Sequence, residues 1–219
     1  MTCAKVLASL AMLAGVLSFV PLQAETFVQD GATFEYTVAN DEVTITAVTA
    51  AAGRLAFPSE IDGLPVRTIA ENAAQNLVDI TEIHIPTNVT YIGYAPFQGC
   101  STITNMVLPF VGSRRGISGY SYFGFLFGAY SYNSQNSVVP QALKRVEITD
   151  ETVLDNNAFY SCSSLESLSL PKSLTSVGGG RSLWLFESAR TGYPLCRFPA
   201  RIFWVHVLRL SFRGLLLQL

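Results

Sequence analysis

The hydrophobic positions in the middle of the chain recur in a fixed pattern that closes on a proline. Before each of Pro86, Pro109 and Pro171, apolar residues stand one, three and six positions back. Alternation with a period of two predicts a short β-strand with one face inward, and a proline at its end stops the pairing of that strand. The pattern predicts strands near residues 82–86, 105–109, 145–149 and 167–171.

The same stretches share further positions, which indicates a repeat. Pro86 and Pro109 are 23 residues apart, and Pro109 and Pro171 are 62 apart, which is one period plus 39 residues. One unit of this length cannot bury its apolar side alone, so units must stack into a solenoid with a continuous core. The positions that we expect in this core are Phe97, Cys100, Ile103, Phe159, Cys162 and Leu165.

These units resemble the BspA-type leucine-rich repeats, which read approximately I-P-x-x-V-x-x-I-G-x-x-A-F-x-x-C-x-x-L-x-x-I-x-I-P. Residues 86–109 read PTNVTYIGYAPFQGCSTITNMVLP, and residues 157–178 read NAFYSCSSLESLSLPKSLTSVG. The resemblance covers about residues 55–180. Its first copy departs from the pattern, with Ala74 at the Phe position and Leu77 at the Cys position. The resemblance implies a short, right-handed, β-rich solenoid of the leucine-rich-repeat type.

Two appendages flank these units. Residues 34–48 alternate apolar and polar side chains around Asn40 and Asp41, which predicts a β-hairpin. Within residues 25–54, this hairpin would form an N-terminal cap over the open edge of the first repeat.

An insertion at about residues 110–145 is rich in aromatic residues and glycine. One interpretation is a loop that contacts a ligand, because exposed tyrosine is effective contact surface. The other interpretation, which we favour, is a long loop whose aromatic side chains pack against the repeats. The candidate contact residues are Tyr120, Tyr122, Phe123, Phe125, Tyr130 and Tyr132.

The first 24 residues have the organisation of a secretory signal peptide. Lys5 precedes an apolar run from Val6 to Val20, and Ala24 stands before a plausible cleavage point at Glu25. The run is short for a membrane span. A retained N-terminal anchor is the alternative. Near the other end, Arg209 interrupts the apolar stretch, so we expect no transmembrane span in the mature chain.

Residues 181–219 depart from the repeat. A period of 23 places the next Cys at position 185, where Leu185 stands, although Pro194 is in register. Reading codons for residues 184–188 one nucleotide later can give Gly-Cys-Ser-Ser, which restores the motif at Cys162. We therefore favour a reading-frame slip that leaves an aberrant tail without repeat register. A divergent C-terminal cap is the alternative.

Charge and motif content narrow the function classes. Residues 25–180 carry 15 acidic and 7 basic residues, a net charge of −8, whereas nucleic-acid-binding proteins usually have a basic body. No G-x-S-x-G, H-E-x-x-H, C-x-x-C or phosphate-binding glycine motif is present. We expect no enzyme activity, no cofactor, no metal site and no nucleic-acid partner.

Two groups of polar residues leave alternatives open. Asp150, Glu151 and Asp155 either bind a cation weakly or form a solvated acidic face, and we favour the second. Cys100 and Cys162 are explained as buried thiols, although a disulfide would form if the insertion left their units adjacent.

The repeat and the leader together suggest an exported protein. By resemblance, we expect a secreted or cell-surface module for protein binding and adhesion, with partners on host or neighbouring cells. The alternative is a truncated, frameshifted fragment of a larger surface repeat protein with no independent function.

Overall fold

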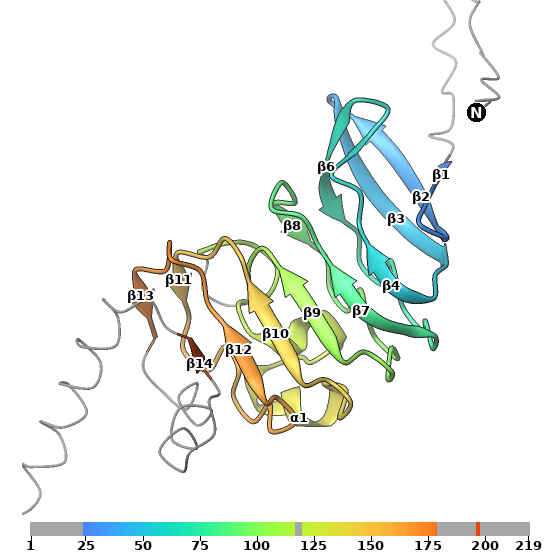
Figure 1. Ribbon diagram of the computed structural model, residues 1–219. Helices are drawn as coiled ribbons and strands as arrows, with labels where there is room; N and C mark the ends of the chain where they lie inside the picture. The colour runs from blue at the N-terminus through green and yellow to red at the C-terminus, as the bar shows by residue number, and fades with distance from the viewer. Residues whose placement is uncertain (1–23, 117–119, 179–195, 198–219) are drawn as a thin grey trace, which may run out of the picture.

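The computed structural model describes residues 24–116, 120–178 and 196–197. A parallel β-sheet runs through this part of the chain, and successive strands of the sheet pair in the order β4, β7, β9, β10, β12 and β14. Figure 1 shows β4 to β12 side by side. The bounds of the six strands are β4 Gly53–Ala56, β7 Ile80–His84, β9 Asn105–Leu108, β10 Arg145–Ile148, β12 Ser167–Ser169 and β14 Cys196–Arg197. Strands therefore lie at all four predicted places, including residues 145–149, where no proline closes the strand.

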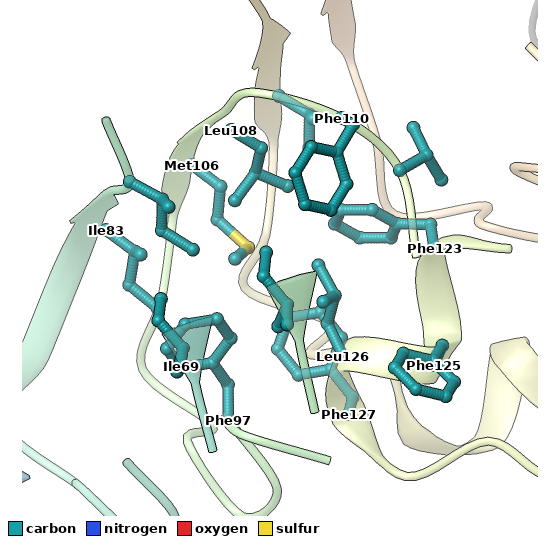
Figure 2. Packing of buried hydrophobic residues seen from close by; sticks show 14 of the residues in the cluster. Ile69, Ile83, Phe97, Met106, Leu108, Phe110, Phe123, Phe125, Leu126 and Phe127 are labelled. Carbon is teal, nitrogen blue, oxygen red and sulfur yellow. The ribbon is translucent and has the colours of Figure 1, made fainter. Parts of the chain in front are cut away.

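A second set of short parallel pairings lies on the return path of the chain. β6 (Leu64–Ile69) pairs with both β3 (Glu42–Ala50) and β8 (Tyr91–Ile92), and further along β11 (Val153–Leu154) pairs with β13 (Ser176–Val177). The apolar side chains of the two sets belong to one continuous core, part of which Figure 2 shows.

An antiparallel ribbon precedes the parallel strands. β2 (Ala32–Ala39) pairs with β3 around a turn at Asn40 and Asp41, both of which have positive φ. The sequence pattern did not indicate β1 (Glu25–Gln29), which pairs with β2 across a second tight turn. Because β3 also pairs in parallel with β6, the ribbon continues into the repeat region.

Phenylalanine rings form a continuous row through the core. Consecutive ring centroids are separated by 5.6, 6.1, 6.4, 5.6 and 5.2 Å. The row reads Phe34, Phe57, Phe97, Phe127, Phe123 and Phe159. The row connects the antiparallel ribbon to the last units that the structure describes. In the first unit, where Ala74 stands at the Phe position of the repeat, Phe57 supplies the ring of the row.

The stretch between β9 and β10 leaves the sheet and returns to it, since these two strands pair directly. It contains two 3-10 helices, η1 (Phe123–Phe127) and η2 (Tyr132–Ser134), and a single-turn α-helix, α1 (Gln135–Val138). The buried side chain of Gln135 accepts a hydrogen bond from the Gly124 backbone N–H and donates to the backbone oxygens of Asn157 and Tyr160. These bonds fix η1 against the following unit.

The predicted aberrant tail lies mostly outside the described residues, as does the predicted signal peptide. At Cys196 and Arg197, the tail pairs in parallel with β12 and extends the sheet by one short strand. None of the helices in the described ranges is both long and apolar enough to cross a bilayer.

Candidate functional site

A cleft of about 650 Å³ opens where three successive units present their loops on the same side. Six of its nine lining residues are aromatic, and the other three are a glutamate, a serine and an arginine. The lining residues are Glu71, Tyr91, Tyr94, Ser113, Arg114, Tyr120, Tyr122, Phe125 and Tyr130. We call this site the tyrosine cleft.

Phe125 at the base of the tyrosine cleft organises the surrounding rings. Its centroid lies 5.4 Å from Tyr94, 5.6 Å from Tyr120 and 6.2 Å from Tyr122. Tyr130 stacks on Tyr94 at 5.7 Å, with 30° between the ring planes. Offset and edge-on packing of this kind is the favourable geometry for aromatic pairs.

Two tyrosine hydroxyl groups are tied to the backbone and hold their rings in place. Tyr94 donates to the Gly128 carbonyl oxygen at 2.6 Å, and Tyr122 donates to the Ala129 carbonyl oxygen at 3.1 Å. Burial is the largest cause that raises the pKa of Tyr94 to about 12, and the nearby Tyr130 and Glu71 side chains contribute to the same rise. Tyr94 therefore remains a protonated donor at physiological pH.

The backbone of residues 111–116 carries Arg114 into the cleft. Gly112 has a φ of 82°, and a Cβ at this position would collide with the Tyr120 carbonyl oxygen. The Ser113 N–H donates to that same oxygen at 3.0 Å. The guanidinium of Arg114 then lies 4.8 Å from the centroid of the Tyr91 ring, a cation–π distance.

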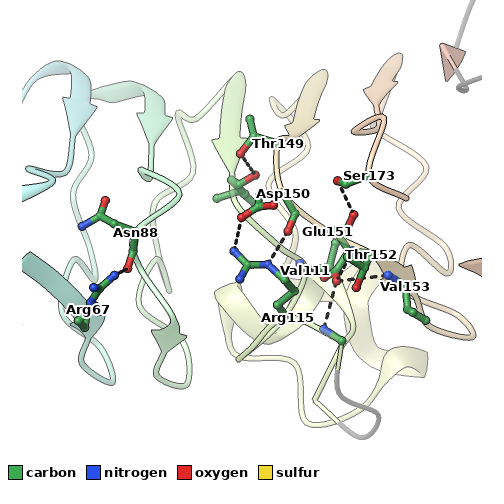
Figure 3. A network of polar contacts seen from close by, with 12 residues as sticks. Arg67, Asn88, Val111, Arg115, Thr149, Asp150, Glu151, Thr152, Val153 and Ser173 are labelled. Carbon is green, nitrogen blue, oxygen red and sulfur yellow. Dashed lines mark hydrogen bonds and ion pairs between the residues drawn. The ribbon is translucent and has the colours of Figure 1, made fainter. Parts of the chain in front are cut away.

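Three carboxylates in residues 150–155 anchor this backbone, which corrects the sequence-based interpretation of a solvated acidic face. Glu151 is buried, and its carboxylate accepts hydrogen bonds from four backbone N–H groups, including those of Val111 and Gly116 (Figure 3). Asp150 pairs with Arg115, and Asp155 accepts a hydrogen bond from the Ser121 hydroxyl at 2.6 Å. No pattern within one unit could indicate the partners Val111, Arg115 and Ser121, because they lie 40, 35 and 34 positions away in the sequence.

The structure divides the six candidate contact residues between surface and core. Tyr120, Tyr130 and Tyr132 are 59%, 87% and 40% exposed, but Tyr132 does not line the cleft. Tyr122 and Phe125 are nearly buried and form part of the cleft wall.

Phe123 has no exposed surface and stacks on Phe159, so a ligand-contacting role for Phe123 is wrong. The physical reason is the bond from its N–H to the Ala158 carbonyl oxygen, which turns η1 inward.

The candidate core residues of the repeat are all buried, and Cys100 and Cys162 are free thiols. A disulfide between Cys100 and Cys162 is therefore excluded, because the unit that contains β10 separates theirs. Burial raises the pKa of the Cys162 thiol to about 12 and also raises that of Cys100. The Cys100 thiol donates a hydrogen bond to the Ala74 carbonyl oxygen at 3.1 Å. Both thiols act as packing residues.

Metal-ligating residues are scattered rather than gathered. Among residues 24–116, 120–178 and 196–197, no group of three or more His, Cys, Asp or Glu side chains is placed to hold a metal ion. The tyrosine cleft offers aromatic faces and two opposite charges instead. Its chemistry is that of a recognition site.

Comparison with known proteins places these features in a family context. The BspA type leucine rich repeat region matches residues 55–124 and 131–181 in six copies. The match includes most of the stretch that the sequence pattern predicted as an insertion and leaves only residues 125–130 between its two segments. No curated protein matches the sequence.

Several solved bacterial structures are similar to this chain. A leucine-rich repeat protein of T. pallidum is 18% identical, and the alignment covers 76% of this chain and 96% of that one, with a TM-score of 0.37. One from Bacteroides ovatus is 22% identical over 69% of this chain and 37% of that one, with a TM-score of 0.43. One from Bacteroides capillosus is 16% identical over 71% and 99%, with a TM-score of 0.33.

Proposed function

Because this chain belongs to the BspA-type leucine-rich repeat family, which matches more than half of its residues, we propose that it is an exported, cell-surface module that binds proteins. Repeat proteins commonly use the extended surface of their stacked units for such contacts. The role in adhesion is the specific form that we propose, with partners on host or neighbouring cells. Catalysis, a cofactor and a nucleic-acid partner are not part of this proposal.

Two features of the chain support the proposed architecture. The parallel order of β4, β7, β9, β10 and β12 fits a short solenoid of stacked units. The antiparallel ribbon before β4 fits a cap at residues 25–54, because β3 pairs with β6, whose edge would otherwise be open to other chains. Residues 55–180 are then the repeat domain, and residues 110–145 are its elaborated part.

The tyrosine cleft is the observation that carries the proposed binding function. Its exposed rings, Tyr120 and Tyr130, are large, rigid and amphipathic, and such side chains dominate the contact surfaces of binding proteins. Exposed aromatic side chains that are clustered and held in place by buried neighbours are typical of an interaction surface. The cleft is therefore the surface at which we expect the partner.

Attachment of protein-coated beads to cells tests this function. Beads that carry the purified chain should attach to partner cells, and mild protease treatment of the cells should abolish attachment if the ligand is a protein. The Tyr120→Ala and Tyr130→Ala double variant should attach several-fold less than wild type, whereas Tyr132→Ala, outside the cleft, should attach normally. Attachment that survives protease treatment would contradict a protein ligand.

Export has a separate test. We propose cleavage after Ala24, on the basis of the apolar run that precedes it. Expression in a secreting bacterial host, followed by N-terminal sequencing of the exported chain, should give a sequence that starts at Glu25. A cell-associated chain that retains Met1 would indicate a membrane anchor instead.

A second proposal follows from the loss of the repeat pattern after Gly180. The chain would be a frameshifted fragment of a larger surface repeat protein, without an independent function. Sequencing the gene around codon 180 distinguishes the two proposals. An offset frame that continues the 23-residue repeat supports the fragment, and early stop codons in that frame support a true C-terminal cap.

A further inference from the structure

The tyrosine cleft offers exposed aromatic rings to an incoming ligand. The hydroxyl of Tyr94 is engaged by the backbone, and Tyr130 stacks on the Tyr94 ring while remaining 87% exposed. Tyr120 packs on Phe125 and is 59% exposed. The face of an aromatic ring carries negative electrostatic potential, so a cleft with several such faces favours a cation.

A carboxylate in the same cleft adds to this preference. Glu71 lines the cleft and is exposed, and the four ion pairs found in the described residues involve other carboxylates. A cation that enters the cleft would therefore find a carboxylate that no described basic residue neutralises. The net charge of −8 over residues 25–180 attracts basic partners over a longer range.

The cleft already holds one guanidinium in the expected manner. Arg114 lies over the ring of Tyr91, and the other cation–π contact of the described chain involves Arg115 and Phe110. No described cation lies over Tyr120 or Tyr130, so these two exposed rings remain available. The anchoring of residues 111–116 by Glu151 keeps Arg114 in its own place.

We propose that the tyrosine cleft receives an arginine side chain from the surface of the partner protein; this proposal rests on the protein-binding function proposed above. A guanidinium is planar and weakly hydrated, so it stacks on tyrosine faces. Its paired N–H groups can also donate to both oxygens of the Glu71 carboxylate. Lysine offers a compact, strongly hydrated charge that gains less from stacking.

Titration with short peptides tests this specificity directly. The probe is acetyl-Gly-Arg-Gly-amide, and the matched control replaces arginine with citrulline, which keeps the planar shape but removes the charge. Binding to the purified full-length chain is followed by NMR of isotopically labelled tyrosine rings. We expect saturable shifts with arginine, roughly tenfold weaker binding with citrulline, and weaker arginine binding at high salt.

Three variants assign the effect to individual residues. Glu71→Gln and Tyr130→Leu should each weaken arginine binding by about three- to tenfold, and Tyr132→Leu should leave it unchanged. Both cleft residues are exposed, so the variants should retain the wild-type melting temperature, which circular dichroism checks.

Several results would overturn the inference. Equal binding of the two peptides, or unchanged arginine binding in Tyr130→Leu, would exclude recognition of the charge in the cleft. Saturation of the same ring signals by maltohexaose, with displacement of the peptide, would assign the cleft to sugars. Protease-sensitive bead attachment without arginine binding would refute this inference alone, and arginine binding without bead attachment would refute the proposed function alone.

Discussion

Truncation of one ring in the phenylalanine row tests how the units hold together. Phe97 has no exposed surface, and its ring packs between Phe57 at 6.1 Å and Phe127 at 6.4 Å. Its backbone N–H donates to the Leu126 carbonyl oxygen, and its own carbonyl oxygen accepts from the Cys100 N–H. Phe97→Ala should therefore leave a cavity that the anchored backbone cannot close.

The expected loss follows from these contacts. Replacing a buried Phe by Ala costs ~3–5 kcal/mol, and each aromatic pair contributes ~0.5–1.5 kcal/mol beyond its buried area. Because Phe97 loses two such pairs, we expect about 4 kcal/mol. This is a large share of the ~5–15 kcal/mol by which a typical domain is stable.

Urea denaturation followed by far-UV circular dichroism measures this loss. The midpoint should fall by about 2 M if the slope is about 2 kcal/mol/M, and the slope itself should not change. Phe159→Ala, at the last position of the row, should lower the free energy of unfolding by ~3–5 kcal/mol. The surface control Tyr132→Ala should lower it by less than about 0.5 kcal/mol. A loss below about 1.5 kcal/mol for Phe97→Ala would refute an internal row of mutually supporting rings.

Further predictions concern the buried polar groups. Glu151→Gln should lower the free energy of unfolding by ~2–3 kcal/mol. It should also speed hydrogen exchange at the backbone amides that donate hydrogen bonds to this carboxylate. Glu147→Gln, at an exposed position, should change neither the stability nor the exchange rates. Iodoacetamide should leave Cys100 and Cys162 unmodified in the native chain and modify both in urea, as peptide mass spectrometry can show; rapid native labelling would contradict their burial. Burial, with the hydrogen bond to Glu25, raises the pKa of Tyr36 from 10.0 to about 12. The unfolded chain therefore loses this proton first, so the contribution of Tyr36 to the free energy of unfolding should be constant below pH 10 and fall between pH 10 and about 12. In urea denaturation at several alkaline pH values, Tyr36→Phe should lose less stability between pH 10 and about 12 than the wild type. The same loss in both proteins would contradict this role of Tyr36.

The repeat region was predictable because its information is local. The family resemblance drawn from the residues is confirmed by the family match, and strands lie where alternation before Pro86, Pro109 and Pro171 predicted them. β1 was missed, although Asp30 and Gly31, both with positive φ, form the kind of turn that joins antiparallel strands.

The candidate site was predictable only in the aromatic residues between β9 and β10, whereas Tyr91 and Tyr94 were missed. The sequence indicated Tyr120 and Tyr130, but Glu71 and Arg114 join them only because the units stack. Anchoring by Glu151 was equally hidden, since its hydrogen-bond partner Val111 lies 40 residues earlier. Contacts between units depend on register across the stack, and no pattern within one unit records that register.

The phenylalanine row also bears on the order in which the chain folds. Synthesis delivers the N-terminus first, and Phe34 and Phe57, at the first end of the row, are the earliest rings of the row to emerge. The antiparallel ribbon pairs only with residues close to it in sequence, so it can form before later units have been synthesised. Each new unit then finds an exposed ring on which to stack, and propagation needs only nearest-neighbour contacts. The row is thus suited to vectorial folding from the N-terminus, in which the ribbon forms first and each ring offers a packing surface to the next unit.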